Sequence, residues 1–137
     1  MKFFLDNNLP PAWAEGLSGL SSRETPPILV QSLRGKFKAN TPDHEWIRAL
    51  DVEGGWCVLS QDRFGKGNPE REALRRSKLI VFRLEATWSK HGYWDKTQAL
   101  VKWWPRILEQ ARLLEGGAVI EVPYHYRQGR FRFSTPR

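Results

Sequence analysis

The sequence has 137 residues, with 22 lysines and arginines against 15 acidic residues, which gives a formal net charge of +7 at pH 7. This length predicts a single domain, residues 1–137, that can bury a substantial core. No apolar run reaches the length that a membrane-spanning helix requires. The basic excess favours a polyanionic partner, either nucleic acid or an acidic protein, with solubility alone as the alternative explanation.

Cys57 is the single cysteine, so the chain cannot form an internal disulfide. This is typical of proteins in a reducing cytoplasm. The neighbours of Cys57 are apolar, which favours a core side chain over a reactive thiol. The first residues also lack the basic and then apolar pattern of a secretory signal. We therefore expect a cytoplasmic protein.

An apolar run at residues 3–5 predicts a buried strand that ends at Asp6. Two prolines then lead into a helix over residues 12–20, because proline is favoured in the first helical turn. In an open α/β sheet, ligands bind beyond the carboxyl ends of the strands, so Asp6 is expected in that crevice. The predicted apolar face of the helix consists of Trp13, Leu17 and Leu20.

A second apolar run, at residues 28–33, predicts a strand that is buried on both faces. After a basic loop, a helix is expected with Thr41 as its N-cap and Pro42 at its first position. Asp43 lies in its first turn and Glu45 just beyond, where carboxylates suit the positive end of the helix dipole. Its predicted apolar face consists of Trp46, Ile47 and Leu50.

A third strand is predicted at residues 56–59, and it runs out at Ser60 and Asp62. A glycine-bearing loop, a helix from Asn68 and a fourth strand at residues 79–84 follow. Strands and helices alternate, which predicts an α/β fold. We expect a parallel sheet with right-handed crossovers and helices on both faces.

The longest predicted helix covers residues 93–114, and Pro105 should kink it or split it in two. A last strand is expected at residues 118–122. The remaining tail, residues 124–137, interleaves arginines with aromatic rings. The favoured interpretation is a hairpin that turns around Gln128 and Gly129.

The alternative for this tail is a nucleic-acid surface, in which rings stack on bases and guanidinium groups contact phosphates. Both interpretations hold if the arginines occupy the exposed face of the hairpin. The predicted nucleic-acid contacts of the tail are Arg127, Arg130 and Arg132.

Asp6, Asp43 and Asp62 are the acids that stand out, because strand ends and helix starts can meet at one edge of a parallel sheet. Clustered carboxylates repel one another, and a divalent cation relieves the repulsion. Mg²⁺ and Mn²⁺ prefer oxygen ligands and can activate water for attack on a phosphodiester. The alternatives are a cap role for Asp6, helix-start stabilisation for Asp43 and a turn role for Asp62.

Three segments resemble motifs of the PIN-like domain family, the fold of the VapC-type ribonuclease toxins. They are MKFFLDNNLPP, TPDHEWIRAL and WCVLSQDRFGKG, and the resemblance covers about residues 1–90. It implies a three-layer α/β/α fold with a central, mostly parallel sheet, to which this chain adds a long C-terminal helix and a short β tail.

The resemblance also implies roles for individual residues. Asp6, Asp43 and Asp62 match the metal-binding acids of the family, Ser60 matches its hydroxyl residue and Asn8 matches its asparagine. It implies Mg²⁺- or Mn²⁺-dependent cleavage of RNA, a cognate antitoxin protein and dimerisation. Ser60 and Asn8 would orient the acids or a metal-bound water, with Glu45 as a further supporting side chain. The residues expected to guide the RNA are Arg63, Lys66 and the tail arginines.

The chain departs from the family pattern at two positions. Asn7 replaces a glutamate, and Arg63 stands where another acid can occur. A weaker metal site favours a second hypothesis, a catalytically degraded module that binds RNA or protein. A third hypothesis, a haloacid-dehalogenase-like phosphatase, requires a second aspartate where this chain has Asn8.

Overall fold

A single mixed sheet forms the centre of the protein in the computed structural model, which describes residues 1–61 and 68–134. Within these residues the strand order is β2-β1-β3-β4-β5-β6. The first five strands are parallel, and β6 pairs antiparallel with β5. The strands are β1 (Lys2–Leu5), β2 (Leu29–Ser32), β3 (Trp56–Ser60), β4 (Ile80–Leu84), β5 (Ala118–Val122) and β6 (Arg132–Ser134).

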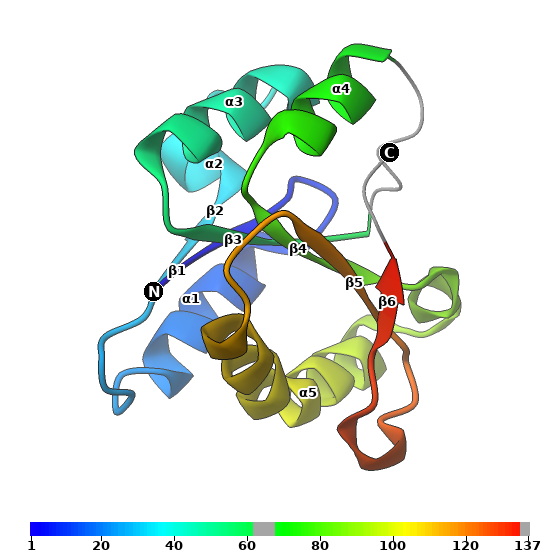
Figure 1. Cartoon of the computed structure of the whole chain (residues 1–137). Helices are drawn as coiled ribbons and strands as arrows, with labels where there is room; N and C mark the ends of the chain where they lie inside the picture. The colour runs from blue at the N-terminus through cyan, green and yellow to red at the C-terminus, as the bar shows by residue number, and fades with distance from the viewer. Residues whose placement is uncertain (62–67, 135–137) are drawn as a thin grey trace.

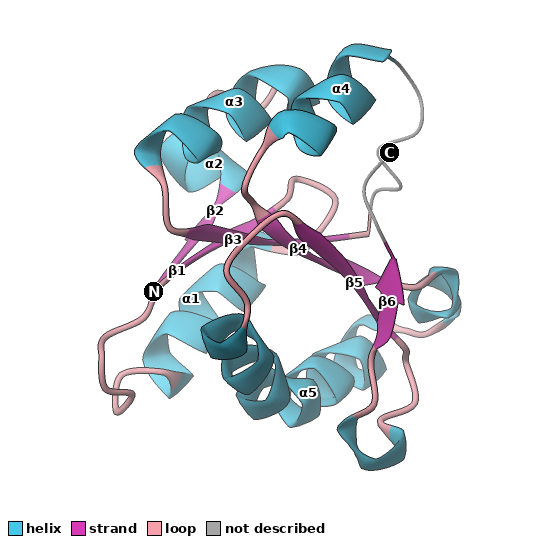
Figure 2. Cartoon of the chain, viewed as in Figure 1, coloured by secondary structure: helices cyan, strands magenta, loops and turns pink. Residues whose placement is uncertain are grey.

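Helices cover both faces of this sheet (Figure 1 and Figure 2). α1 and α5 lie on one face, and α2, α3 and α4 lie on the other. The predicted three-layer α/β/α fold is confirmed. The helices are α1 (Pro11–Leu20), α2 (Leu33–Lys36), α3 (Asp43–Glu53), α4 (Asn68–Arg76) and α5 (Tyr93–Leu113), with short 3₁₀ turns η1 (Ala86–Lys90) and η2 (Arg127–Gly129).

β1 shows how the sheet separates two apolar cores. Successive strand side chains point to opposite faces. Phe3 and Leu5 therefore pack with α1 and α5, whereas Phe4 packs with α3. The Phe4 ring lies 4.9 Å from the ring of Trp46, which is fully buried. Burial on both faces explains why this strand reads as a continuous apolar run.

Two core predictions are confirmed. The α3 face formed by Trp46, Ile47 and Leu50 is fully buried. Cys57 is 4% exposed, and burial raises the pKa of its thiol to about 12.

Two burial predictions are wrong. β2 is not buried on both faces, because it is the edge strand of the sheet, and Leu29 at its start is 46% exposed. The predicted strand also ended too late, since Leu33 already begins α2. Leu20 is 61% exposed rather than packed with Trp13 and Leu17, because it lies in the final turn of α1.

The predicted helix boundaries need two corrections. Pro42, not Thr41, is the N-cap of α3, and the Thr41 hydroxyl donates a hydrogen bond to the Lys38 carbonyl at 2.7 Å instead of capping the helix. Pro105 does not split α5, which runs as one helix of 21 residues.

The predicted C-terminal hairpin exists with a different first strand. β5 and β6 pair antiparallel, with Glu121 opposite Arg132. The segment at residues 124–126 is not a strand, because its rings turn inward instead. Tyr124 packs against Trp88 at 5.2 Å, and Tyr126 packs against Trp103 at 4.7 Å.

Residues 1–61 and 68–134 contain no helix with both the length and the apolar character needed to cross a lipid bilayer.

Candidate functional site

Asp6 lies at the carboxyl edge of the sheet, immediately after β1. Its backbone N–H donates to the Leu59 carbonyl at 3.1 Å, and its own carbonyl accepts from the Leu9 N–H at 3.0 Å. The first bond extends the ladder between β1 and β3, and the second turns the chain toward α1. Asp6 is only 5% exposed, so its carboxylate is held in a fixed position.

Ser60 lies beside Asp6, because Leu5 and Leu59 are register partners in the adjacent parallel strands. Its hydroxyl donates to Oδ2 of Asp6 at 2.8 Å, and Ser60 is fully buried. The other oxygen, Oδ1, accepts from the backbone N–H of Asn7 at 2.6 Å. A carboxylate oxygen accepts more than one hydrogen bond or metal contact, so these two bonds are compatible with metal binding.

Two exposed asparagines follow Asp6. Oδ1 of Asn8 accepts from the backbone N–H of Gln61 at 3.5 Å, which links the ends of β1 and β3. Oδ1 of Asn7 accepts from Nε of Arg34 at 3.2 Å. Sequence reasoning missed Arg34 as a neighbour of the site. Its place two residues after β2, near the end of another parallel strand, was the signal that could have found it.

Asp43 lies at the same edge of the sheet as Asp6. α3 returns the chain from the end of β2 to the start of β3, so its N-terminus lies at the carboxyl edge. Oδ1 of Asp43 accepts from Nε1 of Trp46 at 3.0 Å. Since Trp46 packs on Phe4, one short chain of contacts connects Asp43 to the strand that carries Asp6. Glu45, in the same helical turn, is exposed.

Three predicted site residues, Asp62, Arg63 and Lys66, lie outside the described residues. Among the residues that the structure does describe, no group of three or more histidine, cysteine or acidic side chains is placed to hold a metal ion. The described acids do offer the type of ligand that a hard cation prefers, because Asp6 and Asp43 both carry carboxylate oxygens at this edge of the sheet.

The tail arginines come together in a cavity of about 340 Å³. Arg127, Arg130 and Arg132 line it, with His125 among the other residues. Glu85 also contributes, from the carboxyl end of β4. The cavity therefore lies on the same edge of the sheet as Asp6.

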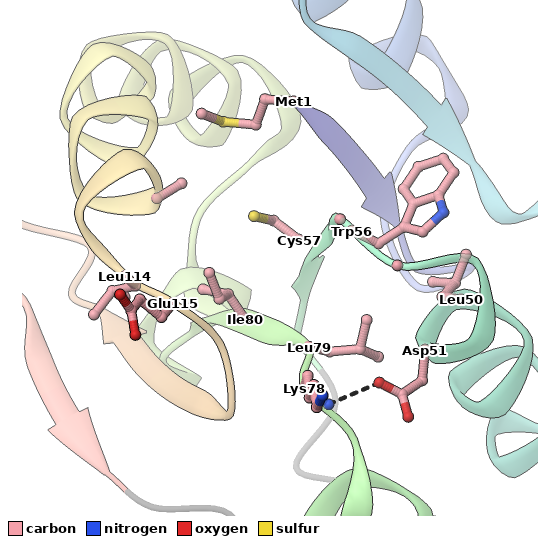
Figure 3. Close-up of a pocket in the computed structure, with 13 residues that line it drawn as sticks. Met1, Leu50, Asp51, Trp56, Cys57, Lys78, Leu79, Ile80, Leu114 and Glu115 are labelled. Atoms are coloured by element: carbon pink, nitrogen blue, oxygen red, sulfur yellow. Dashed lines mark hydrogen bonds between the residues drawn. The ribbon is translucent and has the colours of Figure 1, made fainter.

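A second cavity, of about 310 Å³, lies at the opposite, amino edge of the sheet (Figure 3). Met1, Cys57 and Ile80 contribute to its lining, and Oδ1 of Asp51 accepts from the Lys78 backbone N–H at 2.8 Å. The described acids of the three sequence motifs, Asp6, Asp43 and Glu45, do not line this cavity, so it is separate from the described part of the candidate site.

In a comparison with known protein families, a family profile described as "PIN like domain" matches residues 1–86, which is more than half of the chain. The matched region runs from β1 through β4 and contains Asp6, Asp43, Ser60 and Asp62. No curated protein and no solved structure gives a significant match.

Proposed function

The chain belongs to the PIN-like domain family, and on that premise we propose that it is a divalent-metal-dependent endoribonuclease, the toxin of a toxin–antitoxin pair. PIN domains are generally nucleases. The observation that carries the proposal is the buried carboxylate of Asp6, which Ser60 holds at the carboxyl edge of the sheet. A buried acid that is fixed at a ligand-binding edge is suited to metal binding.

Asp6, Asp43 and Asp62 are the residues that would hold Mg²⁺ or Mn²⁺. When bound, such an ion lowers the pKa of a coordinated water and offsets charge on the phosphodiester. The oxygen donors of these residues suit either cation.

The remaining residues of the site act on the acids and the substrate. The Ser60 hydroxyl and the Asn7 N–H each take one acceptor position of Asp6, which fixes the orientation of its carboxylate. Groups of this kind hold a metal-ligating side chain in the orientation that binding requires, and they do not contact the reacting atoms. The Asn8 amide, on the exposed side of the site, would orient a water or a phosphate oxygen. Arg63 and Lys66 would guide the RNA backbone toward the acids.

A second candidate function is RNA or protein binding without cleavage. The replacement of a family glutamate by Asn7 favours it, because the described part of the site then holds fewer carboxylates. The amide of Asn7 accepts from Arg34, so this position holds a neutral group bonded to a cation rather than an additional acid. This hypothesis differs from the first in one measurable respect: RNA retention would be indifferent to chelation of divalent metals.

The proposal includes a protein partner and a compartment. A toxin of this type would be held inactive by a small antitoxin in the cytoplasm and could form a homodimer. The net charge of +7 supports an acidic antitoxin segment, and the buried, single Cys57 is compatible with a reducing compartment. A neighbouring gene for a small DNA-binding protein, and co-purification with its product, would test this part.

The first experiment is cleavage of total RNA by the purified protein in Mn²⁺. We expect cutting that stops in EDTA and is abolished in Asp62→Ala, while Glu15→Gln, a change at an exposed acid of α1, leaves it unaltered. Cleavage that persists in Asp62→Ala would reject this site. Metal-independent RNA retention without any cutting would establish the binding module instead.

A further inference from the structure

The turn in the C-terminal tail has an unusual backbone. Arg127, Gln128 and Gly129 have φ angles of 38°, 62° and 70°, so three consecutive residues are left-handed. Only glycine adopts this conformation without a steric penalty. Arg127 and Gln128 are therefore strained, and such strain persists only where the surroundings hold it and is concentrated at ligand clamps and active sites.

α5 holds this turn in place. Nε of Arg106 donates to the Gly129 carbonyl at 2.9 Å, and the Gly129 N–H donates to the Tyr126 carbonyl at 2.7 Å. A Cβ atom at Gly129 would lie 3.0 Å from the Tyr126 hydroxyl and 3.2 Å from the Arg106 side chain, so a larger residue would require these side chains to shift. The Arg106 guanidinium also lies 4.7 Å from the centre of the Phe131 ring. Contacts with α5 and within the tail thus hold the turn in this conformation.

The anchored turn presents positive charge. Arg127 and Arg130 are exposed and line the 340 Å³ cavity together with Arg132. Glu85 is the carboxylate of this cavity, and its oxygens already accept from Arg132 at 3.1 Å and from Thr87 at 2.6 Å. Within residues 1–61 and 68–134, no carboxylate forms an ion pair with Arg127 or Arg130. Counted over the described residues that line it, the cavity therefore carries a net positive charge.

We propose that this cavity binds a backbone phosphate of the RNA at a distance from the cleaved bond and so positions the strand over Asp6. The identity of the ligand as RNA rests on the proposed function. Guanidinium groups match phosphate oxygens in geometry and form charge-assisted hydrogen bonds with them. A small concave site, in which two arginines have no carboxylate partner among the described residues, fits a single phosphate better than the broad face of an acidic protein.

The location of the cavity supports this role. β1, β3, β4 and β5 are consecutive neighbours in the sheet, and adjacent strands lie about 4.8 Å apart. The ends of β4 and β5 are therefore about 10–14 Å from Asp6, a span of a few nucleotides. The family match ends at residue 86, so the three arginines of this cavity lie beyond it, whereas Glu85 lies within it.

The test measures RNA binding in EDTA, where no metal-dependent cleavage occurs. The probe is a short fluorescein-labelled single-stranded RNA, and its affinity is measured by anisotropy across a series of salt concentrations. We expect the Arg127→Gln/Arg130→Gln double variant to bind at least about tenfold more weakly. Its slope of log affinity against log salt should fall by about 0.7 for each phosphate that the protein no longer neutralises.

The matched control is Arg23→Gln/Arg48→Gln, which removes the same charge from two exposed arginines elsewhere on the molecule. Its affinity should stay within about twofold of wild type at physiological salt, where distant charges are screened. An equal loss of affinity in both double variants would overturn the proposal, since overall charge would then explain binding. Unchanged affinity in the tail variant would also overturn the proposal. An acidic protein would then be the favoured ligand of the cavity.

The phosphate site and the nuclease activity can be tested independently of each other. Binding in EDTA requires no catalysis, so absence of cleavage leaves the expected change in salt slope intact. Normal cleavage with an unchanged salt slope in the tail variant would reject the phosphate site alone.

Discussion

Asp6 and Ser60 form a buried, hydrogen-bonded pair at the carboxyl edge of the sheet, within the candidate site. The hydroxyl donates to a carboxylate that is 5% exposed, from a serine with no exposed surface. Hydrogen bonds to charged groups are stronger than those between neutral groups, and a buried acceptor that loses its donor is costly. This pair therefore contributes to stability as well as to the orientation of the acid.

The variant Ser60→Ala should lower the free energy of unfolding by about 1–3 kcal/mol, because Oδ2 of Asp6 loses its buried donor. Urea unfolding followed by tryptophan fluorescence measures this change. The control is Ser89→Ala, which removes an exposed hydroxyl bonded to the Ala86 carbonyl and should change stability by less than about 0.5 kcal/mol. Equal stability of Ser60→Ala and wild type would contradict this account of the pair.

The buried thiol of Cys57 predicts that the free energy of unfolding depends on pH. Burial raises the pKa of its thiol to about 12, whereas an unfolded thiol ionises near pH 8.5–9. Below pH 8.5 both states are protonated and the thiol contributes no pH dependence. Between about pH 9 and 12 the unfolded state alone loses the proton, so the free energy of unfolding falls as pH rises.

Comparison with Cys57→Ala isolates this contribution, because all other groups titrate alike in the two proteins. The stability difference between wild type and Cys57→Ala should shrink between pH 8 and pH 10.5, by at most about 1.4 kcal/mol per pH unit. Urea unfolding at each pH measures it. A difference that stays constant over this range would show that the thiol ionises as readily in the folded protein.

α3 connects the second acid of the site to the core. Trp46 donates to Asp43 three residues before it and packs on Phe4 of β1. Trp56 makes a similar contact, since its Nε1 donates to Glu53, three residues before it, at 2.8 Å. The second contact lies at the start of β3, away from the carboxyl edge, which provides a matched comparison.

The variant Trp46→Phe keeps an aromatic ring in the core but leaves Asp43 without this donor. Mn²⁺-dependent RNA cleavage should fall by up to about tenfold, the equivalent of one hydrogen bond of about 1.4 kcal/mol. Trp56→Phe should leave the cleavage rate within about twofold of wild type. A similar loss of rate in both variants, at equal folded fraction, would argue against a positioning role for Trp46.

Local sequence patterns were sufficient to predict the elements that carry the acids. The apolar run before Asp6 and the helical spacing of Trp46, Ile47 and Leu50 depend on neighbours in sequence, and both predictions agree with the structure. The exposure of Leu29 could not be predicted in this way, because it depends on which strand lies at the edge of the sheet.

The C-terminal tail also has contacts that local sequence patterns could not predict. The interleaved arginines and rings predicted a hairpin, but the anchoring of its turn requires Arg106, which lies 23 residues before Gly129. Likewise, the contact between Arg34 and Asn7 joins residues 27 positions apart. Contacts of this kind follow from the packing of complete elements, which periodicity and spacing do not encode.

The molecule as a whole separates its two sheet edges. Asp6, Asp43 and the basic cavity of the tail lie at the carboxyl edge, whereas the cavity around Met1 and Cys57 lies at the amino edge (Figure 3). This arrangement suits the proposed function, in which the arginines would attract the backbone of a polyanionic substrate and the acids would bind the metal.

Under the proposed function Mn²⁺ should stabilise the entire fold, because only the folded protein holds Asp6 and Asp43 at one edge of the sheet. At a free Mn²⁺ concentration of 100 times its dissociation constant, the free energy of unfolding should rise by about 2.7 kcal/mol. Thermal unfolding with and without Mn²⁺ measures the effect. Asp6→Asn should abolish it, and Glu15→Gln should not. A melting temperature that is indifferent to Mn²⁺ would count against a metal site.

Anomalous diffraction from crystals grown with Mn²⁺ tests the proposed metal site most directly. We expect one anomalous peak at the carboxyl edge of the sheet, within coordination distance of the carboxylates of Asp6 and Asp43, and no such peak in Asp6→Asn. Well-ordered carboxylates at saturating Mn²⁺ without a peak between them, or a peak that persists in Asp6→Asn, would rule out a metal site at these acids.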